Sequence, residues 1–176
     1  LDVLNTMLGG SFSSRLNQNL REEHGYRYGA GSVFDMRASA GPFYATAGVQ
    51  TDKTVESLTE FFKELDGMRA QPPADELTRV RNLLAHGFPG EFETTSNMAG
   101  KLTELFVYGL EDSFFGEYVP KIEAVSAAEI ERASKQYITS DRFAVVVVGD
   151  LSKIEKPIRD ANFGPVRVVS MDEALR

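Results

Sequence analysis

Few residues of this chain have the types and spacing that metal chemistry needs. Its two histidines, His24 and His86, are far apart in the sequence, and neither adjoins another histidine. The chain therefore cannot hold a His-x-x-Glu-His or His-Glu-x-x-His zinc site. We expect His24, which follows Glu22 and Glu23, to be a solvated residue at a helix end, and we assign a metal to neither histidine.

The serines and glycines near the start carry no signature of a hydrolase or a phosphate site. The composition allows a serine triad, but the chain has no Gly-x-Ser-x-Gly elbow. Gly9 and Gly10, before Ser11, lack both the Gly-Lys-Ser/Thr ending and the preceding strand of a phosphate-binding loop. We interpret the two glycines as a helix break, and Ser13 or Ser14 as the cap of the next helix.

The most informative pair is Arg21 and Tyr28, which flank a predicted turn at Gly25. Arg21 falls in the last turn of a predicted helix and Tyr28 at the start of a predicted strand, so folding the strand back would bring the two side chains near each other. A planar guanidinium and a phenolic hydroxyl together suit the gripping of a peptide carbonyl or the stabilisation of an oxyanion. The same residues are also favourable without any site, since arginine suits a helix C-terminus and tyrosine suits a strand.

Charge and composition exclude several partners. The net charge is −7, and the basic residues are scattered among the acids, so the footprint of a nucleic-acid binder is missing. The longest purely apolar run, Phe143–Val148, is far shorter than the roughly 20 residues that span a bilayer, so we expect no membrane span. The chain has no cysteine, which fits a reducing cytoplasm or an oxidising bacterial periplasm equally and leaves the compartment open.

Helical patterns cover most of the chain. It opens at Leu1 without an initiator methionine, so we expect that it was cut from a longer protein. Apolar residues at helical spacing predict helices over residues 1–8, over 14–25 and through most of 55–138. Ser126 with Glu129 forms a predicted capping box, and Ser152 with Glu155 forms a second one for a short helix.

β-forming residues predict a sheet. The stretches 26–36 and 43–50, joined by turn residues 39–42, predict an antiparallel hairpin. The run Phe143–Val148 predicts a strand buried on both faces or at the sheet centre, and residues 166–169 predict a last strand.

This order of elements predicts the fold class. Strands, a long helical block and then further strands indicate an α+β domain, with helices packed on one face of a mostly antiparallel sheet. We expect one such domain over residues 1–170, and a tail or linker over residues 171–176.

Two sets of residues resemble a known family. The segment from Leu8 to Tyr28 reads Leu-Gly-Gly-Ser-Phe-Ser-Ser-Arg-Leu, then Leu-Arg-Glu-Glu-His-Gly-Tyr-Arg-Tyr. It closely resembles the signature of the carboxy-terminal half of zinc peptidases of the insulinase, pitrilysin and mitochondrial processing peptidase family. The second set, residues 108–110, 121–126 and 145–150, follows in the order that this family uses, so the resemblance covers nearly the whole chain.

The resemblance implies a division of labour between two half-domains. In this family the amino-terminal half carries His-x-x-Glu-His and the zinc, so this chain would hold no cofactor and would be inactive alone. Its partners would be an amino-terminal zinc-binding domain or subunit of the same family, and a peptide substrate. Arg21 and Tyr28 match the pair that reaches across to hold substrate backbone or the tetrahedral intermediate.

The resemblance also assigns a loop and a missing strand. Gly9, Gly10, Ser11 and Phe12 match a glycine-containing loop that processing-peptidase relatives use to guide substrate. The first strand of such a half-domain would precede Leu1.

Two other functions stay open. The family includes inactive members that serve as structural or complementing subunits, and this chain could be one of them. A free-standing module that captures extended peptides on a sheet edge is a third hypothesis, based on the hairpin and on Gly29 and Gly31, which thin its first strand. The host we expect is a bacterium, with the protein in the cytoplasm, in the periplasm or secreted.

Overall fold

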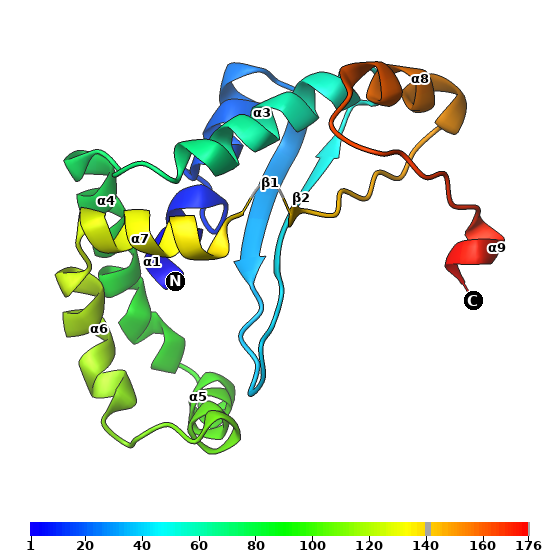
Figure 1. Cartoon of the computed structure of the whole chain (residues 1–176). Helices are drawn as coiled ribbons and strands as arrows, with labels where there is room; N and C mark the ends of the chain where they lie inside the picture. The colour runs from blue at the N-terminus through cyan, green and yellow to red at the C-terminus, as the bar shows by residue number, and fades with distance from the viewer. Residues whose placement is uncertain (140–141, 176) are drawn as a thin grey trace.

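The computed structural model of the chain describes residues 1–139 and 142–175, with all of their side chains except those of Arg27 and Tyr28. Helices make up most of the fold and pack against one hairpin, β1 (Arg27–Phe34) and β2 (Phe43–Val49) (Figure 1). The longer helices are α1 (Asp2–Leu8), α3 (Thr54–Gly67), α4 (Ala74–Gly87), α5 (Thr95–Tyr108), α6 (Phe114–Ala124), α7 (Ala127–Tyr137) and α8 (Leu151–Ala161). The short ones are α2 (Arg15–Asn17), the π-helical turn η1 (Gln18–Glu23), the 3₁₀ turns η2 (Thr51–Lys53) and η3 (Phe88–Phe92), and α9 (Met171–Ala174). The chain is therefore an α+β protein, as predicted.

The hairpin forms where alternating β-formers meet a turn. Its strands are antiparallel, with Ala30 opposite Ala47 and Phe34 opposite Phe43. Along β2 the odd-numbered residues are half-buried and the even-numbered ones are exposed, so one face of the strand is turned to the core. This is the alternation that period-2 side-chain geometry imposes on a sheet with one covered face. The predicted hairpin is confirmed.

Helix α1 lies at the centre of the core. Val3, Leu4, Met7 and Leu8 are almost wholly buried, and the helix contacts α4, α7 and β1. Two further helices supply core residues from their apolar stripes, among them Leu65 from α3 and Val80 from α4. Burial of these stripes, rather than helix propensity, accounts for most of the helical stability.

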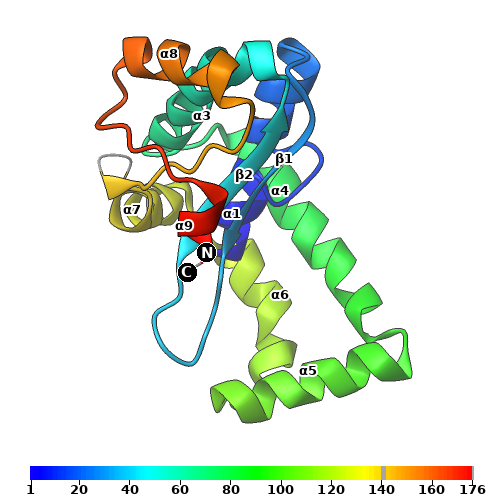
Figure 2. The ribbon, with the colours of Figure 1, turned by 90° about the vertical axis from the view of Figure 1, so that its right-hand side faces the viewer.

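Helices α4, α5 and α6 form an arm that extends from this core (Figure 2). Helix α4 packs along α6, while α5 lies across the far end of both and has no buried residue. Aromatic rings fill the space inside the arm, with Phe88 stacked on Tyr118 at 4.2 Å between ring centroids. The Tyr118 hydroxyl donates to Asp2 at 3.0 Å and so ties the arm to α1.

Two predicted strands are wrong. Residues 143–148 run beside β2 as an irregular segment, and residues 166–169 are also outside any strand. Val146 and Val148 are 84% and 91% exposed, so the run is not a buried central strand. A β-former run becomes a strand only when a neighbour completes its hydrogen-bond ladder, and no described residue does so here.

One of the two predicted capping boxes is present in the structure, and the other is not. Ser126 and Glu129 form the expected capping box at α7. At α8 the cap is Asp150, whose carboxylate accepts from the Ser152 N–H at 3.1 Å, so the predicted box of Ser152 with Glu155 is wrong. Asp150 rather than Ser152 caps α8 because it directly precedes the helix and aspartate is as good an N-cap residue as serine.

No described helix has both the length and the apolarity to cross a bilayer. The segment predicted to be a tail contains the short helix α9.

Candidate functional site

The predicted site begins at the π-helical turn η1, which carries Arg21. The His24 N–H reaches the Asn19 carbonyl at 3.1 Å, five residues back, and the Tyr26 N–H reaches the Leu20 carbonyl at 2.9 Å. Gly25 then turns the chain into β1 with φ of 65°, a left-handed conformation that favours glycine. The predicted helix and its Gly25 turn are therefore present, but the last turn is wider than an α-helix. Single π-helical turns of this kind are frequent at functional sites.

Arg21 is held over the ring of Phe12. Its guanidinium carbon lies 4.4 Å from the Phe12 ring centroid, and its Nε is 3.4 Å from a Glu22 carboxylate oxygen. The Arg21 side chain is 31% exposed, and Phe12 is 68% exposed. A guanidinium over an aromatic face is stabilised by roughly 0.5–1 kcal/mol at an exposed site. The arrangement presents a partly desolvated cation at the surface.

Tyr28 lies in β1, but its side chain is outside the described part of the structure. The predicted approach of Tyr28 to Arg21 therefore stays a prediction.

Asn17 locks the helical segment of Arg21 to β1. Its amide nitrogen donates to the Ala30 carbonyl at 2.8 Å, and its amide oxygen accepts from the Ala30 N–H at 2.7 Å. The same nitrogen reaches the Ser11 carbonyl at 3.0 Å, so one side chain joins the loop, the helix and the strand. Asn17 is buried, and it occupies the edge of β1 at Ala30 that a paired peptide would need. This contact weighs against capture of peptides on that edge.

The side chains of Asn19 and Arg15 also fix the segment, from the helical side. The Asn19 amide nitrogen donates to Glu60 at 2.8 Å and to Glu64 at 2.7 Å, both on α3. Hydrogen bonds from Lys63 and then from Asn19 hold the pKa of Glu60 below its usual value. Arg15 forms a two-bond pair with Glu76 of α4 at 2.9 and 2.7 Å, and this bonding raises the pKa of Arg15. Arg21 thus belongs to a segment that hydrogen bonds tie to β1, α3 and α4.

The predicted substrate loop, Gly9 to Phe12, is packed tightly against its neighbours. A Cβ atom on Gly9 would lie 2.5 Å from the Ser32 backbone nitrogen, and one on Gly10 would lie 2.7 Å from the Asn5 side chain. The Ser11 hydroxyl donates to the Thr6 carbonyl at 3.0 Å. Gly9 is buried and has a packing role, whereas Gly10 and Phe12 are exposed.

Replacing Gly9 by alanine should destabilise the fold by roughly 1–3 kcal/mol, the usual cost of overpacking a tight contact. The Ser32 nitrogen belongs to the backbone of β1, so it cannot move aside without disturbing the strand. Urea unfolding followed by circular dichroism measures the change. Gly100→Ala in α5, where a Cβ would meet nothing within 4 Å, is the control and should be neutral or stabilising. Equal effects from the two substitutions would contradict the packing role.

The histidines and acids of the described residues form no metal site. No group of three or more histidine, aspartate or glutamate side chains there is placed to hold an ion. His24 stacks on Tyr26 with ring centroids 4.9 Å apart and lies 3.8 Å from Glu60. His24 is exposed at the end of η1, as predicted.

A cavity of about 520 Å³ lies away from this region, between β2, α3 and residues 143–149. None of Gly9, Gly10, Ser11, Phe12 and Arg21 lines it.

Sequence reasoning did not find Asn17 or Asn19. The sequence did hold a signal for them. Asn17 and Asn19 adjoin the apolar residues Leu16 and Leu20, although polar residues of such a helix are expected on its solvent face.

Part of this chain is similar in sequence to known proteins. Residues 1–84 match the sequence model of a family described as the peptidase M16 inactive domain. An uncharacterized zinc protease of Rickettsia bellii is 26% identical over 151 residues, which are 82% of this chain and 35% of that protein. Another from Streptomyces coelicolor is 27% identical over 152 residues, 86% of this chain and 33% of that protein. This chain spans about a third of the length of these curated relatives.

One solved structure shows the same fold. A peptidase M16 inactive domain from Pseudomonas fluorescens superposes with a TM-score of 0.71 and 21% identity, over 78% of this chain and 33% of that one.

Proposed function

We propose that this chain, whose residues 1–84 match the model of the peptidase M16 inactive domain, completes the active site of a zinc endopeptidase. In the proposal, Arg21 and Tyr28 hold the peptide backbone and the tetrahedral intermediate, and an amino-terminal half supplies the metal. The observation that supports it best is the Arg21 guanidinium, stacked on Phe12 at the surface and carried by a turn that Asn17 and Asn19 anchor.

The chemistry fits the residues that the chain provides. Zinc in the other half would activate the attacking water and polarise the scissile carbonyl. As the carbonyl becomes tetrahedral its oxygen gains negative charge, which a guanidinium and a phenolic hydroxyl can stabilise by donating hydrogen bonds. Donors fixed before the reaction need no reorganisation, which is the value of a turn held by α3, α4 and β1.

Tyr28→Phe in the assembled enzyme should lower the turnover of a fluorogenic peptide by roughly 10- to 1000-fold, the scale seen when one oxyanion donor is removed. The phenyl ring keeps the size and the strand preference of tyrosine, so folding should be unchanged. Tyr44→Phe on β2, where the ring is 48% exposed, is the matched control and should keep full turnover. Full turnover by Tyr28→Phe as well would remove Tyr28 from the site.

The second candidate is an inactive member that serves as a structural or complementing subunit. The absence of a metal-holding group among the described residues is compatible with it, as it is with the first. Mixing the chain with the zinc-bearing half separates the two. Peptide cleavage that needs both halves supports the first candidate, and a stable complex without cleavage supports the second.

A further inference from the structure

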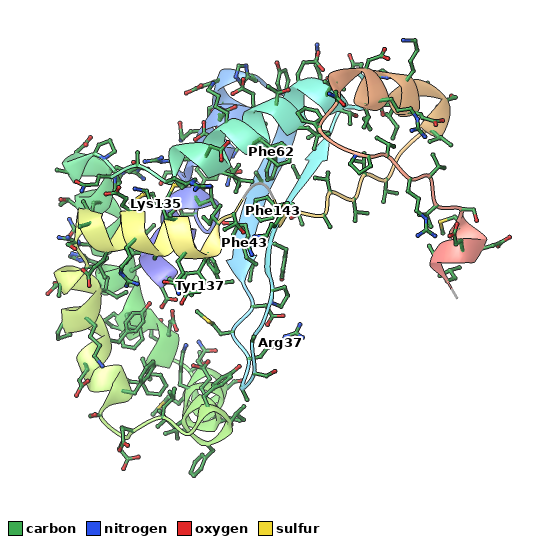
Figure 3. All side chains as sticks on the ribbon, viewed as in Figure 1. Arg37, Phe43, Phe62, Lys135, Tyr137 and Phe143 are labelled. Carbon is green, nitrogen blue, oxygen red and sulfur yellow. The ribbon has the colours of Figure 1, made fainter. Side chains whose placement is uncertain are left out.

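Phe12 differs from most phenylalanines of this fold, which pack ring against ring. The rings of Phe43 and Phe143, for example, lie 5.9 Å apart between centroids, with Phe62 of α3 nearby (Figure 3). Phe12 is instead exposed, in the loop between α1 and α2. A phenylalanine stabilises a fold when its side chain is removed from water, so an exposed ring contributes little to folding by itself. Substitution of Phe12 should therefore leave the stability of the fold almost unchanged.

Hydrogen bonds nevertheless fix the backbone on both sides of Phe12. Before it, the Ser11 hydroxyl donates to the Thr6 carbonyl at 3.0 Å. The Ser11 carbonyl then accepts two hydrogen bonds, from the buried Asn17 amide at 3.0 Å and from the Ser14 N–H at 3.2 Å. The loop is thus anchored to α1 and to the helical segment after it, and the Phe12 ring has a defined place beside that segment.

The Phe12 ring contacts the guanidinium of Arg21. The guanidinium carbon lies 4.4 Å from the ring centroid, within the roughly 6 Å range of a cation–π contact. The π face attracts the cation as a whole, whereas a hydrogen bond would direct a single N–H at an acceptor. The ring therefore restrains where the guanidinium lies without requiring one of its donors, and donors are what the proposed site needs from Arg21.

The ion pair of Arg21 with Glu22 restrains the guanidinium less well. The distance from the Arg21 Nε to a Glu22 carboxylate oxygen is 3.4 Å, and both side chains are partly exposed, so the pair contributes little in water. Glu22 is also the next residue of the same turn, and it moves with Arg21. Phe12 belongs to a separately anchored loop, so its ring relates the guanidinium to a second segment of the fold.

We propose that Phe12 is a positioning residue, whose ring holds the Arg21 guanidinium in the orientation from which it donates to the substrate. This inference rests on the proposed function of Arg21. It gives Phe12 a different role from the guiding of substrate that the resemblance implies. The role requires an aromatic residue, since a π face carries the negative potential that attracts a cation and an aliphatic side chain does not.

Side-chain NMR of this chain tests the contact independently of any activity. The side-chain protons of Arg21 nearest the ring should show a ring-current shift, which Phe12→Tyr should keep and Phe12→Leu should abolish. Phe12→Leu should also lower the order parameter of the Arg21 Nε–H bond, because the side chain gains motion. An Arg21 side chain that stays equally ordered in Phe12→Leu would overturn the proposal, since the ring would then not be what holds it.

Turnover by the proposed two-half peptidase tests the role. Phe12→Leu should lower kcat by roughly 5- to 30-fold, the value of a cation–π contact that assembly partly desolvates. KM should change little, because the donor acts in the transition state. Phe12→Tyr keeps the ring and should keep kcat. Phe106→Leu, at an exposed phenylalanine of α5, is the matched control and should also keep kcat.

Phe12→Leu in an Arg21→Ala background distinguishes positioning from direct contact with substrate. If Phe12 acts through Arg21, the substitution should change kcat by less than about twofold once the guanidinium is gone, because the two effects are coupled. An equal loss in both backgrounds would overturn the proposal, since Phe12 would then contact substrate itself. An unchanged kcat for Phe12→Leu, beside a loss for Arg21→Ala, would overturn this proposal and leave the function of Arg21 standing. Full activity of Arg21→Ala would refute the proposed function, and this inference with it.

Discussion

Arg21→Ala should lower kcat and kcat/KM of the proposed two-half peptidase together by roughly 100- to 1000-fold, because in the proposed function the guanidinium would donate most strongly to an oxygen that is charged only in the transition state. An interaction made equally in the bound substrate would instead raise KM alone. The assay is cleavage of a fluorogenic peptide by this chain combined with its zinc-bearing half, over a range of substrate concentrations.

Two controls make the Arg21 result specific. Arg21→Lys keeps the charge but loses the planar pair of donors, so it should recover only part of the activity. Arg132→Ala removes an exposed arginine of α7 and should leave kcat unchanged. Equal melting temperatures for all of these variants would show that folding is intact. A kcat for Arg21→Ala within threefold of the original would leave the half-domain with a structural role.

Asn17→Ala should be the most destabilising of the substitutions considered, at roughly 2–6 kcal/mol, because two buried backbone groups lose their partners at a cost of about 1–3 kcal/mol each. These groups are the N–H and the carbonyl of Ala30, which is 8% exposed. Denaturant unfolding gives the free energy, and hydrogen exchange at the Ala30 amide gives the local effect.

The matched control is Gln18→Ala, one residue further along the same helical segment and exposed. It should change stability by less than about 0.5 kcal/mol, as surface substitutions usually do. If Asn17→Ala behaved like Gln18→Ala and left the Ala30 amide protected, the side chain would not be what joins the helix to β1.

Elements with short-range causes could be predicted from the sequence. The capping box of Ser126 and Glu129 spans four residues, and the turn at Gly25 needs only a residue that tolerates positive φ. The hairpin follows from alternation within two stretches close in sequence. The sequence also determined that the chain has no two-histidine zinc motif, and its signature from Leu8 to Tyr28 led to the family whose inactive-domain model matches residues 1–84.

Elements whose partners are distant in sequence could not be predicted in this way. Residues 143–148 have every local preference of a strand, yet pairing depends on a neighbour that the described chain does not provide. The role of Asn17 depends on Ala30, which β1 brings beside it, and the position of Arg21 depends on one extra residue in a helical turn. Local propensities depend on a few adjacent residues, whereas strand pairing and buried polar contacts form only when segments distant in sequence come together. For this reason the sequence alone indicated the half-domain and its candidate residues, and the tertiary structure decided what anchors Arg21 and which β-forming runs stay outside the sheet.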